Sequence, residues 1–403
     1  MKAIVWHAPG DIRLDDVAEP AIEEPTDAIV KITRTAICGT DLHTVRGSLP
    51  GMREGTVLGH EAVGTVEELG SAVRGFRRGD RVVICSTVSC GSCSYCRAGY
   101  TAQCDNANPH GPGAGTCFFG GPEPTGPVNG LQAEYARIPW ASSTMVRVPD
   151  ALGDDAALMV SDVLPTGWFG ARIAQVSAGD TVAVLGAGIV GQCAIASAKR
   201  QGARRVIAVD SVRSRLDVAQ SQNAEIVDFT QEDPVTAVHQ LTLGIGVDRV
   251  IDAVGVDAFR PRSGPAAVAL PASPETFDAE QAVSAPDASP DGGQWQPGDA
   301  PSLALRWAAK MTAKAGSIGI AGVYPQGFDR CPVGVIQQRN LTVQGGNCNH
   351  SRHVPHLLEM VTRGTIDPTA FITRRTQPAD AIEAYRAFDL REDGWLKTTV
   401  PMG

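Results

Sequence analysis

The order of apolar and polar residues divides the chain into two parts. Up to about residue 150, short apolar runs such as 28–32, 62–66 and 81–84 stand between glycines and prolines, and no long amphipathic helix interrupts them. Short apolar runs bounded by turn residues are typical of β-strands. We therefore expect the first part of the chain to be rich in β-structure.

From about residue 180, strand-like and helix-like runs alternate. The apolar runs 181–185 and 206–209 flank an alanine-rich stretch, 189–201, that has the composition of a helix. Two further apolar runs, 250–254 and 317–321, are also expected to be strands. Strands that alternate with helices predict βαβ units and a parallel sheet. The expected fold class is α/β joined to a β-rich part, with a boundary near residue 150.

Two segments interrupt this rhythm. Residues 105–130 are rich in Gly and Pro, and we expect them to form a long loop. Residues 256–301 are rich in Pro, Ala and Asp and show little apolar periodicity, so we expect an irregular insertion. We favour a solvated surface loop for this insertion. The alternative is a cover over a cofactor cleft, because the insertion leaves a strand end where α/β sheets bind ligands.

Length, composition and charge narrow the possible functions. At about 100–200 residues per domain, the 403 residues predict two domains or three small ones. The chain has 44 Asp and Glu against 35 Lys and Arg, which gives a net charge of −9 and disfavours nucleic acid or an anionic membrane as partner. An apolar share of 43% excludes a disordered chain. With neither a signal peptide nor an apolar run of about 18–20 residues, a cytoplasmic protein is expected.

A glycine-rich motif follows the first strand of the α/β part. Gly186, Gly188 and Gly191 fit the pattern G-x-G-x-x-G, and Asp210 ends the next expected strand. In dinucleotide sites the first glycine makes a tight turn, the second admits the pyrophosphate, and the third allows close helix–strand packing. Asp210 is placed to accept hydrogen bonds from ribose hydroxyls, and its charge would repel a 2′-phosphate, so the motif predicts NAD. A structural turn without cofactor is the alternative. The same site is expected to include Ile189, Val190, Arg215 and Val254.

Four of the ten cysteines lie close together in the sequence, at Cys90, Cys93, Cys96 and Cys104. A disulfide framework is not expected in a soluble chain of this size, so the cluster more often holds a metal. Four thiolates suit tetrahedral Zn²⁺ and leave no open coordination position, which predicts a structural site. An Fe–S cluster and free thiols are the alternatives, although the cysteine spacing differs from ferredoxin runs.

A second group of possible ligands is less distinctive. Cys38 and His43 belong to one short segment, and His60 and Glu61 follow Gly59 in another. Taken alone, Cys38 and His60 have the character of ordinary packing residues. Both lie among glycines in a loop-like setting, however, where side chains converge more easily.

The order of these motifs resembles that of the zinc-dependent medium-chain alcohol dehydrogenases over essentially the whole chain. The resemblance rests on the segment Cys38–His43, the motif G-H-E-A-V-G at 59–64, the four cysteines and the later glycine-rich motif. The segment S-D-V-L-P-T-G at 161–167 further resembles the branch that contains glutathione-independent formaldehyde dehydrogenases. In that branch the third ligand of the catalytic zinc is Asp, where many relatives have Cys.

The resemblance implies two Zn²⁺ ions per chain, one structural at the four cysteines and one catalytic. Cys38, His60 and Asp162 are the implied ligands of the catalytic ion, with an open fourth position. Thr40 would take the proton of the substrate hydroxyl and pass it through the cofactor ribose to His43, whose imidazole exchanges protons near neutral pH.

Glu61 resembles the family's carboxylate next to the zinc, which approaches the metal during ligand exchange. A surface ion pair is the alternative for Glu61. Asp41 could orient His60 through its other ring nitrogen. His350, His353 and His356 recur at every third position, and we expect solvated imidazoles there rather than a metal site.

The implied architecture is a GroES-like catalytic domain, residues 1–150 and 346–403, and a Rossmann domain with a doubly wound parallel sheet, residues 151–345, that binds NAD. The implied function is zinc-dependent hydride transfer between NAD and a primary or secondary alcohol, or the matching aldehyde or ketone. A formaldehyde or aldehyde dehydrogenase or dismutase with retained NAD, and a non-catalytic cofactor-binding relative, are the alternatives. Relatives are homodimers or homotetramers, so the same is expected of this chain.

Overall fold

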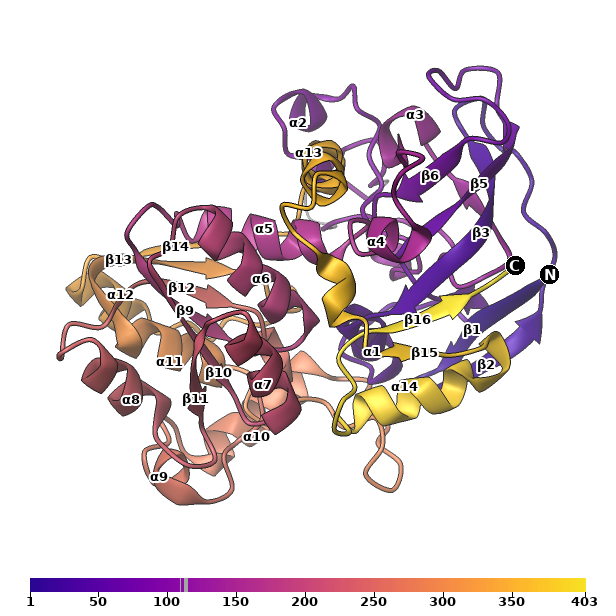
Figure 1. Ribbon diagram of the computed structural model, residues 1–403. Coiled ribbons are helices and arrows are strands. Elements are labelled where there is room, and N and C mark those ends of the chain that lie inside the picture. Colours follow the sequence, from indigo (N-terminus) through magenta and orange to yellow (C-terminus); the bar gives the residue numbers. More distant parts are fainter. Residues whose placement is uncertain (109, 112–114) are drawn as a thin grey trace. The chain divides into compact units, whose positions relative to one another are not determined.

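The computed structural model describes residues 1–108, 110–111 and 115–403, and its chain divides into two compact units (Figure 1). The first unit continues past the expected boundary at residue 150 and takes back the C-terminal segment. Part of the loop expected at 105–130 lies outside the described residues. The first unit comprises Met1–Pro165, Asp287–Gln296 and Asn347–Gly403, and the second comprises Thr166–Pro286 and Pro297–Gly346.

The second unit is built on a six-stranded sheet in which every pair of neighbouring strands is parallel. The strand order is β11-β10-β9-β12-β13-β14. Counted from β9, this is the order 3-2-1-4-5-6 of doubly wound dinucleotide-binding folds, so the expected Rossmann architecture is confirmed. The strands are β9 (Thr181–Leu185), β10 (Arg205–Asp210), β11 (Glu225–Asp228), β12 (Val247–Asp252), β13 (Thr312–Ile320) and β14 (Thr342–Gly345).

Helices cover both faces of this sheet, because its strands carry apolar side chains on both sides. Along β9, Val182 and Val184 pack with residues of α5, α6 and α7. Ala183 and Leu185 point to the other face and pack with residues of α8, α11 and α12. The helices are α5 (Val163–Ile173), α6 (Ile189–Arg200), α7 (Arg213–Ser221), α8 (Pro234–Leu241), α11 (Leu303–Met311) and α12 (Val333–Gln338).

The segment 256–301 is more regular than its composition indicates. It begins within η3 (Gly255–Asp257) and contains α9 (Gly264–Val268) and α10 (Pro274–Ser284). Helix α10 begins where the Ser273 side chain accepts the Thr276 N–H and a proline occupies the first turn, which are two strong helix-start signals. The expectation of an irregular loop is therefore wrong for this part.

Residues 287–296, which we call the arm, belong to the first unit rather than the second. Trp295 is buried there in a cluster that includes Trp6 and Tyr385. Its backbone N–H donates to Asp389 Oδ2 at 2.6 Å. The Asp389 carboxylate also accepts from Arg46 Nε at 2.7 Å, in an ion pair that is almost completely buried. The insertion thus contributes core residues to the first unit.

The first unit is rich in β-structure, as expected. One sheet has the order β15-β16-β3-β5-β6-β8, with β7 also paired to β3, and a smaller sheet has the order β2-β1-β4. The ten-residue strand β3 is the centre of the larger sheet, and its Ala28, Val30 and Ile32 are fully buried. The strands are β1 (Lys2–Ala8), β2 (Asp11–Asp16), β3 (Ala28–Ile37), β4 (Thr56–Val57), β5 (Ala62–Leu69), β6 (Arg81–Ile84), β7 (Tyr135–Ile138), β8 (Met145–Arg147), β15 (Arg374–Arg375) and β16 (Thr398–Pro401).

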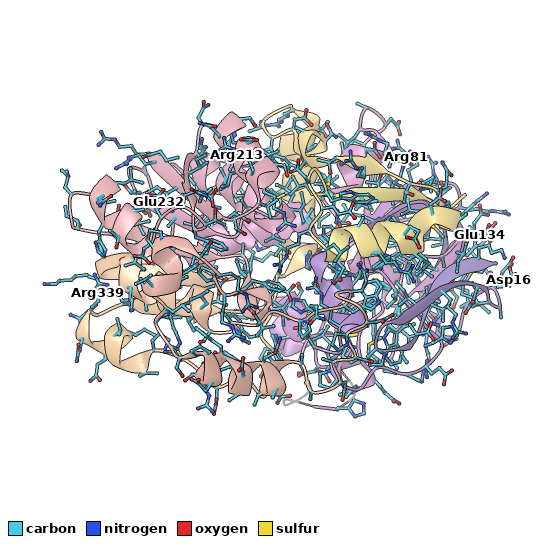
Figure 2. The ribbon with its side chains drawn as sticks, turned by 90° about the horizontal axis from the view of Figure 1, so that it is seen from below. Asp16, Arg81, Glu134, Arg213, Glu232 and Arg339 are labelled. Atoms are coloured by element: carbon cyan, nitrogen blue, oxygen red, sulfur yellow. The ribbon has the colours of Figure 1, made fainter. Side chains whose placement is uncertain are left out.

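The helices of the first unit are mostly short, and several carry residues of the candidate site. They are α1 (Gly39–Val45), α2 (Ser94–Arg97), α3 (Ala141–Thr144), α4 (Asp154–Leu158), α13 (His350–Thr362) and α14 (Ala381–Asp389), with the 3₁₀ turns η1 (Thr101–Gln103), η2 (Glu123–Thr125), η4 (Pro368–Phe371) and η5 (Pro378–Asp380). Acidic and basic side chains are interspersed on both units, as Arg81 and Glu134 in the first and Arg213 and Glu232 in the second illustrate (Figure 2). Among the described residues, no helix combines the length and apolarity that crossing a bilayer requires.

Candidate metal and dinucleotide sites

Strand β3 ends directly at Cys38, which is the N-cap of α1. The backbone N–H of Cys38 donates to Asp41 Oδ2 at 2.9 Å, so the third helical residue closes a capping contact over the first turn. This turn holds Cys38 at the strand end, with Thr40 half-buried and His43 buried on the same short helix. The segment Cys38–His43 therefore forms the junction between β3 and α1 in the first unit.

His60 is oriented by a buried chain of polar groups. Its Nδ1 lies 3.0 Å from Asp41 Oδ1. Gln132 Nε2 donates to Asp41 Oδ2 at 3.3 Å, and Tyr385 donates its hydroxyl proton to Gln132 Oε1 at 2.7 Å. The preceding Gly59 has a φ of +89°, and a Cβ there would lie 2.3 Å from Gln132 Cγ, so glycine is required at this turn.

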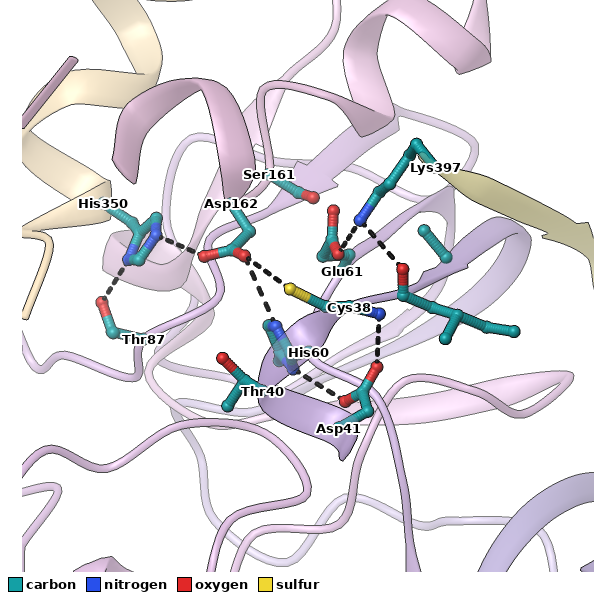
Figure 3. A network of polar contacts seen from close by, with 12 residues as sticks. Cys38, Thr40, Asp41, His60, Glu61, Thr87, Ser161, Asp162, His350 and Lys397 are labelled. Atoms are coloured by element: carbon teal, nitrogen blue, oxygen red, sulfur yellow. Dashed lines mark hydrogen bonds and ion pairs between the residues drawn. The ribbon is translucent and has the colours of Figure 1, made fainter. Parts of the chain in front are cut away.

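Asp162 completes a compact group with Cys38 and His60 (Figure 3). Its Oδ2 lies 3.4 Å from His60 Nε2 and 3.6 Å from Cys38 Sγ. Two atoms bound to one Zn²⁺ at about 2.0–2.3 Å, with a tetrahedral angle of about 109°, lie about 3.3–3.8 Å apart. Both distances fall within that range. Glu61 also belongs to the group, and one ligand atom from each of the four residues lies within 4.8 Å of all the others.

The electrostatics of this group suit a divalent cation. His60 Nε2 is buried, and no residue in the described part of the chain offers it a well-aligned hydrogen bond. Burial alone would lower the pKa of His60, but Asp41 and then Cys38 raise it well above 6.5. Burial would likewise raise the pKa of Asp162, but the hydrogen bond from His350 and the nearby imidazole of His60 hold it well below its usual range. A thiol, an imidazole and a carboxylate are therefore gathered around one buried point, and they are a donor set that fits Zn²⁺.

His350 is a site residue that the sequence analysis missed. Its Nε2 lies 2.8 Å from Asp162 Oδ1, and its Nδ1 lies 3.1 Å from Thr87 Oγ1. His350 is 3% exposed and His353 is 8% exposed, so the expectation of solvated imidazoles is wrong for both, while His356 is exposed.

A signal for His350 was present in the sequence. Positions four, seven, eight and eleven residues after it are apolar and buried, so His350 shares the inward face of α13. The histidines also recur at every third position, and this repeat masks the place of His350 on the buried face. The apolar positions are Val354, Leu357, Leu358 and Val361.

Lys397 is the second missed residue. Its Nζ forms an ion pair with Glu61 Oε1 and also donates to the Ile37 carbonyl at 3.3 Å. Burial alone would lower the pKa of Lys397, but Glu61 outweighs this effect and raises it; burial raises the pKa of Glu61, and Lys397 opposes that rise. The surface alternative for Glu61 is wrong, because Glu61 exposes no surface. No local pattern reveals Lys397, since the contact arises when β16 pairs with β3.

The four cysteines form the second group that could hold a metal. One sulfur from each of Cys90, Cys93, Cys96 and Cys104 lies within 4.8 Å of the others, and none is in a disulfide. Backbone N–H groups donate to these sulfurs, among them that of Cys90 to Cys104 Sγ at 3.2 Å. Burial raises the pKa of Cys90, but hydrogen bonds from Ser92 and Cys93 outweigh it and lower the pKa to about 6. Burial raises the pKa values of Cys96 and Cys104, so the hydrogen bonds of the loop favour the thiolate, which is the form that binds metal, at Cys90 in particular.

The glycine-rich motif runs from the turn between β9 and α6, which holds Gly186 and Gly188, into the first turn of α6, which holds Gly191, and the three glycines have three different surroundings. Gly186 has a φ of +82°, and a Cβ there would lie 2.5 Å from Val254 Cγ2. A Cβ on Gly191 would lie 1.9 Å from the Gly186 carbonyl oxygen. A Cβ on Gly188 would meet only Arg215 Nη1, at 3.9 Å. Gly186 thus makes the turn, Gly191 allows close packing, and Gly188 leaves open space. These are the three roles that dinucleotide binding requires of the glycines.

Asp210 is held beside this turn at the end of β10. Its Oδ2 accepts the Ala187 N–H at 2.7 Å, and its Oδ1 accepts the N–H groups of Ser211 and Val212 at 2.7 and 2.9 Å. At the start of α6, Ile189 is buried and Val190 is half-buried. The expected cofactor residues therefore gather at the carboxyl ends of β9, β10 and β12.

The sequence and the fold are similar to those of known proteins. The sequence matches the family described as "Alcohol dehydrogenase GroES-like domain" over residues 24–150, which confirms the GroES-like fold expected there, and "Zinc-binding dehydrogenase" over residues 190–263. An uncharacterized zinc-type alcohol dehydrogenase-like protein of Bacillus subtilis is 36% identical over 405 residues, with 99% of this chain and 100% of that protein covered.

Two further similarities differ in extent. The solved structure of an alcohol dehydrogenase from Thermus sp. ATN1 superimposes with a TM-score of 0.80 at 28% identity, over the whole of both chains. A glutathione-independent formaldehyde dehydrogenase of Pseudomonas aeruginosa is 36% identical over 271 residues, which cover 64% of this chain and 66% of that protein. The similarity to the formaldehyde dehydrogenase is therefore partial.

Proposed function

The chain belongs to the zinc-type alcohol dehydrogenase family, and we propose that it transfers a hydride between NAD and a primary or secondary alcohol, or the matching aldehyde or ketone. The observation that carries the proposal is the meeting of Cys38, His60 and Asp162 at distances suited to one tetrahedral ion. When bound there, Zn²⁺ would supply a Lewis acid for the substrate oxygen, and NAD would supply the hydride acceptor.

The protein's own residues would handle the proton. We assign Thr40 to accept the proton of the substrate hydroxyl, because it lies in the first turn of α1 next to the ligand Cys38. His43 lies three residues further on the same helix, where side chains are neighbours, and it would receive the proton in turn. His43 would then release the proton to solvent, which completes the relay.

Glu61 would act from behind the ligand group. Its carboxylate lies among the potential ligand atoms, and Lys397 holds it there in a buried ion pair. We assign Glu61 to the role of a reserve carboxylate that approaches the metal while substrate and product exchange. Lys397 would balance its charge when the metal is held only by the other three residues.

The second unit would bind the NAD. Gly188 leaves room for the pyrophosphate at the start of α6, and Ile189 and Val190 supply the first N–H groups of that helix. The Asp210 carboxylate lies at the end of the adjacent strand and would disfavour a 2′-phosphate. Arg215 Nε is buried without a hydrogen-bond partner in the described part of the chain and is available to a cofactor oxygen. Val254 would line the same site.

A metal analysis combined with a substrate panel tests the proposal. We expect two zinc ions per chain, turnover of alcohols or aldehydes with NAD in preference to NADP, and loss of that turnover in Asp162→Ala. One zinc per chain, or full activity of Asp162→Ala, would refute it.

A second candidate is aldehyde dismutation with retained NAD, which the partial similarity to a formaldehyde dehydrogenase supports. Turnover of an aldehyde without added NAD distinguishes the two functions. A simple dehydrogenase shows none, whereas an enzyme that retains its cofactor continues to turn over.

A further inference from the structure

The two oxygens of Asp162 face different partners. Oδ2 points toward Cys38 and His60, while Oδ1 accepts a hydrogen bond from His350 at 2.8 Å (Figure 3). A carboxylate that is free to rotate can offer either oxygen, or both, to a cation. With Oδ1 held by His350, only Oδ2 is presented to the centre of the ligand group.

One proton on His350 can be assigned from its partner. The Asp162 carboxylate is an acceptor, so the hydrogen between the two residues lies on His350 Nε2. On the other side of the ring, Nδ1 lies 3.1 Å from Thr87 Oγ1, and a hydroxyl group can either donate to this nitrogen or accept from it. Both ring nitrogens of this buried side chain are therefore occupied, which fixes the plane of the ring.

The neighbours of His350 connect it to residues 89–104, which carry the four cysteines and which we call the four-cysteine loop. Asn349 Oδ1 accepts the N–H of Ala102, which lies two residues before Cys104. On the other side, Ser351 Oγ lies 3.1 Å from the Oγ of Ser89, the residue before Cys90. The residues directly before and after His350, at the start of α13, thus both contact the four-cysteine loop, while His350 itself contacts Asp162.

We propose that His350 is a positioning residue that presents Asp162 Oδ2 to the metal held by Cys38 and His60. We propose further that the four-cysteine loop holds His350 in place through Asn349. The inference deepens the proposed function and rests on it, since it presumes a metal at this group. Partners of this kind typically change metal affinity by about 10–100-fold when they are removed.

Two substitutions of His350 separate hydrogen bonding from packing. His350→Gln retains an N–H donor at nearly the position of Nε2, while His350→Phe retains the ring volume without a donor. Zinc affinity is measured by competition with a chromogenic chelator, with a separate affinity determined for each of the two ions. We expect His350→Phe to weaken the affinity for one of the two ions by about 10–100-fold. His350→Gln should restore most of that loss. His356→Phe, on the exposed side of the same helix, is the matched control and should bind both ions as the wild type does.

Wild-type zinc affinity in a folded His350→Phe variant overturns the inference. If that variant does not fold, Thr87→Val takes its place, because it removes only the hydroxyl that orients His350. Thr87→Val is expected to weaken the affinity for the same ion. An unchanged affinity in this variant overturns the inference equally. Asn349→Ala tests the second part: an undiminished affinity for the ion at Asp162 rejects the link to the four-cysteine loop.

Failure of the proposed function gives a different result. A wild-type protein that binds two zinc ions but turns over no alcohol or aldehyde refutes the function, and the affinity comparison still decides the role of His350. A wild-type protein that binds zinc only at the four cysteines overturns both.

Discussion

Glu61 and Lys397 form an ion pair in which neither side chain exposes any surface. Removing one partner of a buried pair leaves an unpaired charge and destabilises a protein by about 3–5 kcal/mol. We expect a loss of this size for Lys397→Met, measured by chemical denaturation of the zinc-loaded protein. The double variant Glu61→Gln/Lys397→Met should be more stable than Lys397→Met, because no buried charge is left without a partner.

An exposed ion pair provides the control. Lys2 Nζ lies 2.7 Å from Asp16 Oδ2, but both side chains are largely exposed. Exposed pairs of this kind contribute about 0–1 kcal/mol to the free energy of unfolding. Lys2→Met should therefore have little effect. If the double variant at Glu61 and Lys397 is as unstable as Lys397→Met, the two side chains do not form an interacting pair.

Two glycines of the glycine-rich motif should respond differently to replacement by alanine. A Cβ at Gly188 meets no atom closer than 3.9 Å, whereas a Cβ at Gly191 lies 1.9 Å from a carbonyl oxygen. Gly188→Ala is expected to keep the thermal stability of the cofactor-free protein but to lose about 1–3 kcal/mol of NAD binding free energy. Gly191→Ala is expected to destabilise the cofactor-free protein by about 3 kcal/mol or more. Normal NAD binding by Gly188→Ala would show that the pyrophosphate does not pass over this residue.

The parts of the molecule that the sequence predicts are those set by local chain geometry. The strand, glycine turn, helix and Asp210 follow one another within about one βαβ unit of some 30 residues, so their pattern can be read directly. The four cysteines are likewise local. Asp162 has no such pattern around it, and its assignment came from a family resemblance rather than from its neighbours in the chain.

The missed features depend on contacts between distant segments or on signals that were outweighed. Lys397 reaches Glu61 only because β16 pairs with β3, and no pattern near residue 397 indicates this. The apolar face of α13 indicates that His350 is buried, but the repeat of histidines at every third position favours the opposite interpretation. In the insertion, the helix-start signal Ser273–Pro274 was outweighed by the Pro, Ala and Asp composition around it.

Zinc uptake by the metal-free protein is expected to depend on pH already above pH 6.5. His60 must lose its ring proton to bind a metal, and although burial lowers its pKa, Asp41 and Cys38 raise it well above 6.5. Cys38 must lose its thiol proton as well, and burial raises the pKa of that thiol. Above both raised pKa values no proton competes at these two ligands. As the pH falls below both of them two protons are displaced, so affinity should drop about a hundredfold per pH unit. Chelator competition over this range measures the effect.

Asp41→Asn is the companion variant for that measurement. It removes the carboxylate that lies 3.0 Å from His60 Nδ1, so the pKa of His60 should fall and the part of the pH-dependent range that belongs to His60 should move to lower pH. An unchanged range would mean that Asp41 is not what holds the proton on His60.

Replacing the carboxylate ligand by a thiolate should change the chemistry without removing the metal. Asp162→Cys keeps the total ligand charge at −2, but sulfur donates more electron density to zinc than oxygen does. The zinc becomes a weaker Lewis acid, so the pH profile of kcat is expected to shift to higher pH while zinc content stays at two per chain. An unchanged profile in a fully loaded variant would exclude an electronic role for Asp162.

The arm of the insertion should contribute to the stability of the first unit. Trp295 is buried there and its backbone N–H donates to Asp389, which is paired with Arg46. Truncating a buried tryptophan typically costs about 3–5 kcal/mol, and we expect Trp295→Ala to lose that much in chemical denaturation followed by circular dichroism. Val268, in α9 of the same insertion, is 90% exposed, so Val268→Ala should stay within about 0.5 kcal/mol of the wild type. Equal effects would mean that the insertion is uniformly solvated, as its composition alone indicates. A large effect confined to Trp295 would mean that this segment is part of the core of the first unit, and that it helps to hold α1, which carries Thr40 and His43.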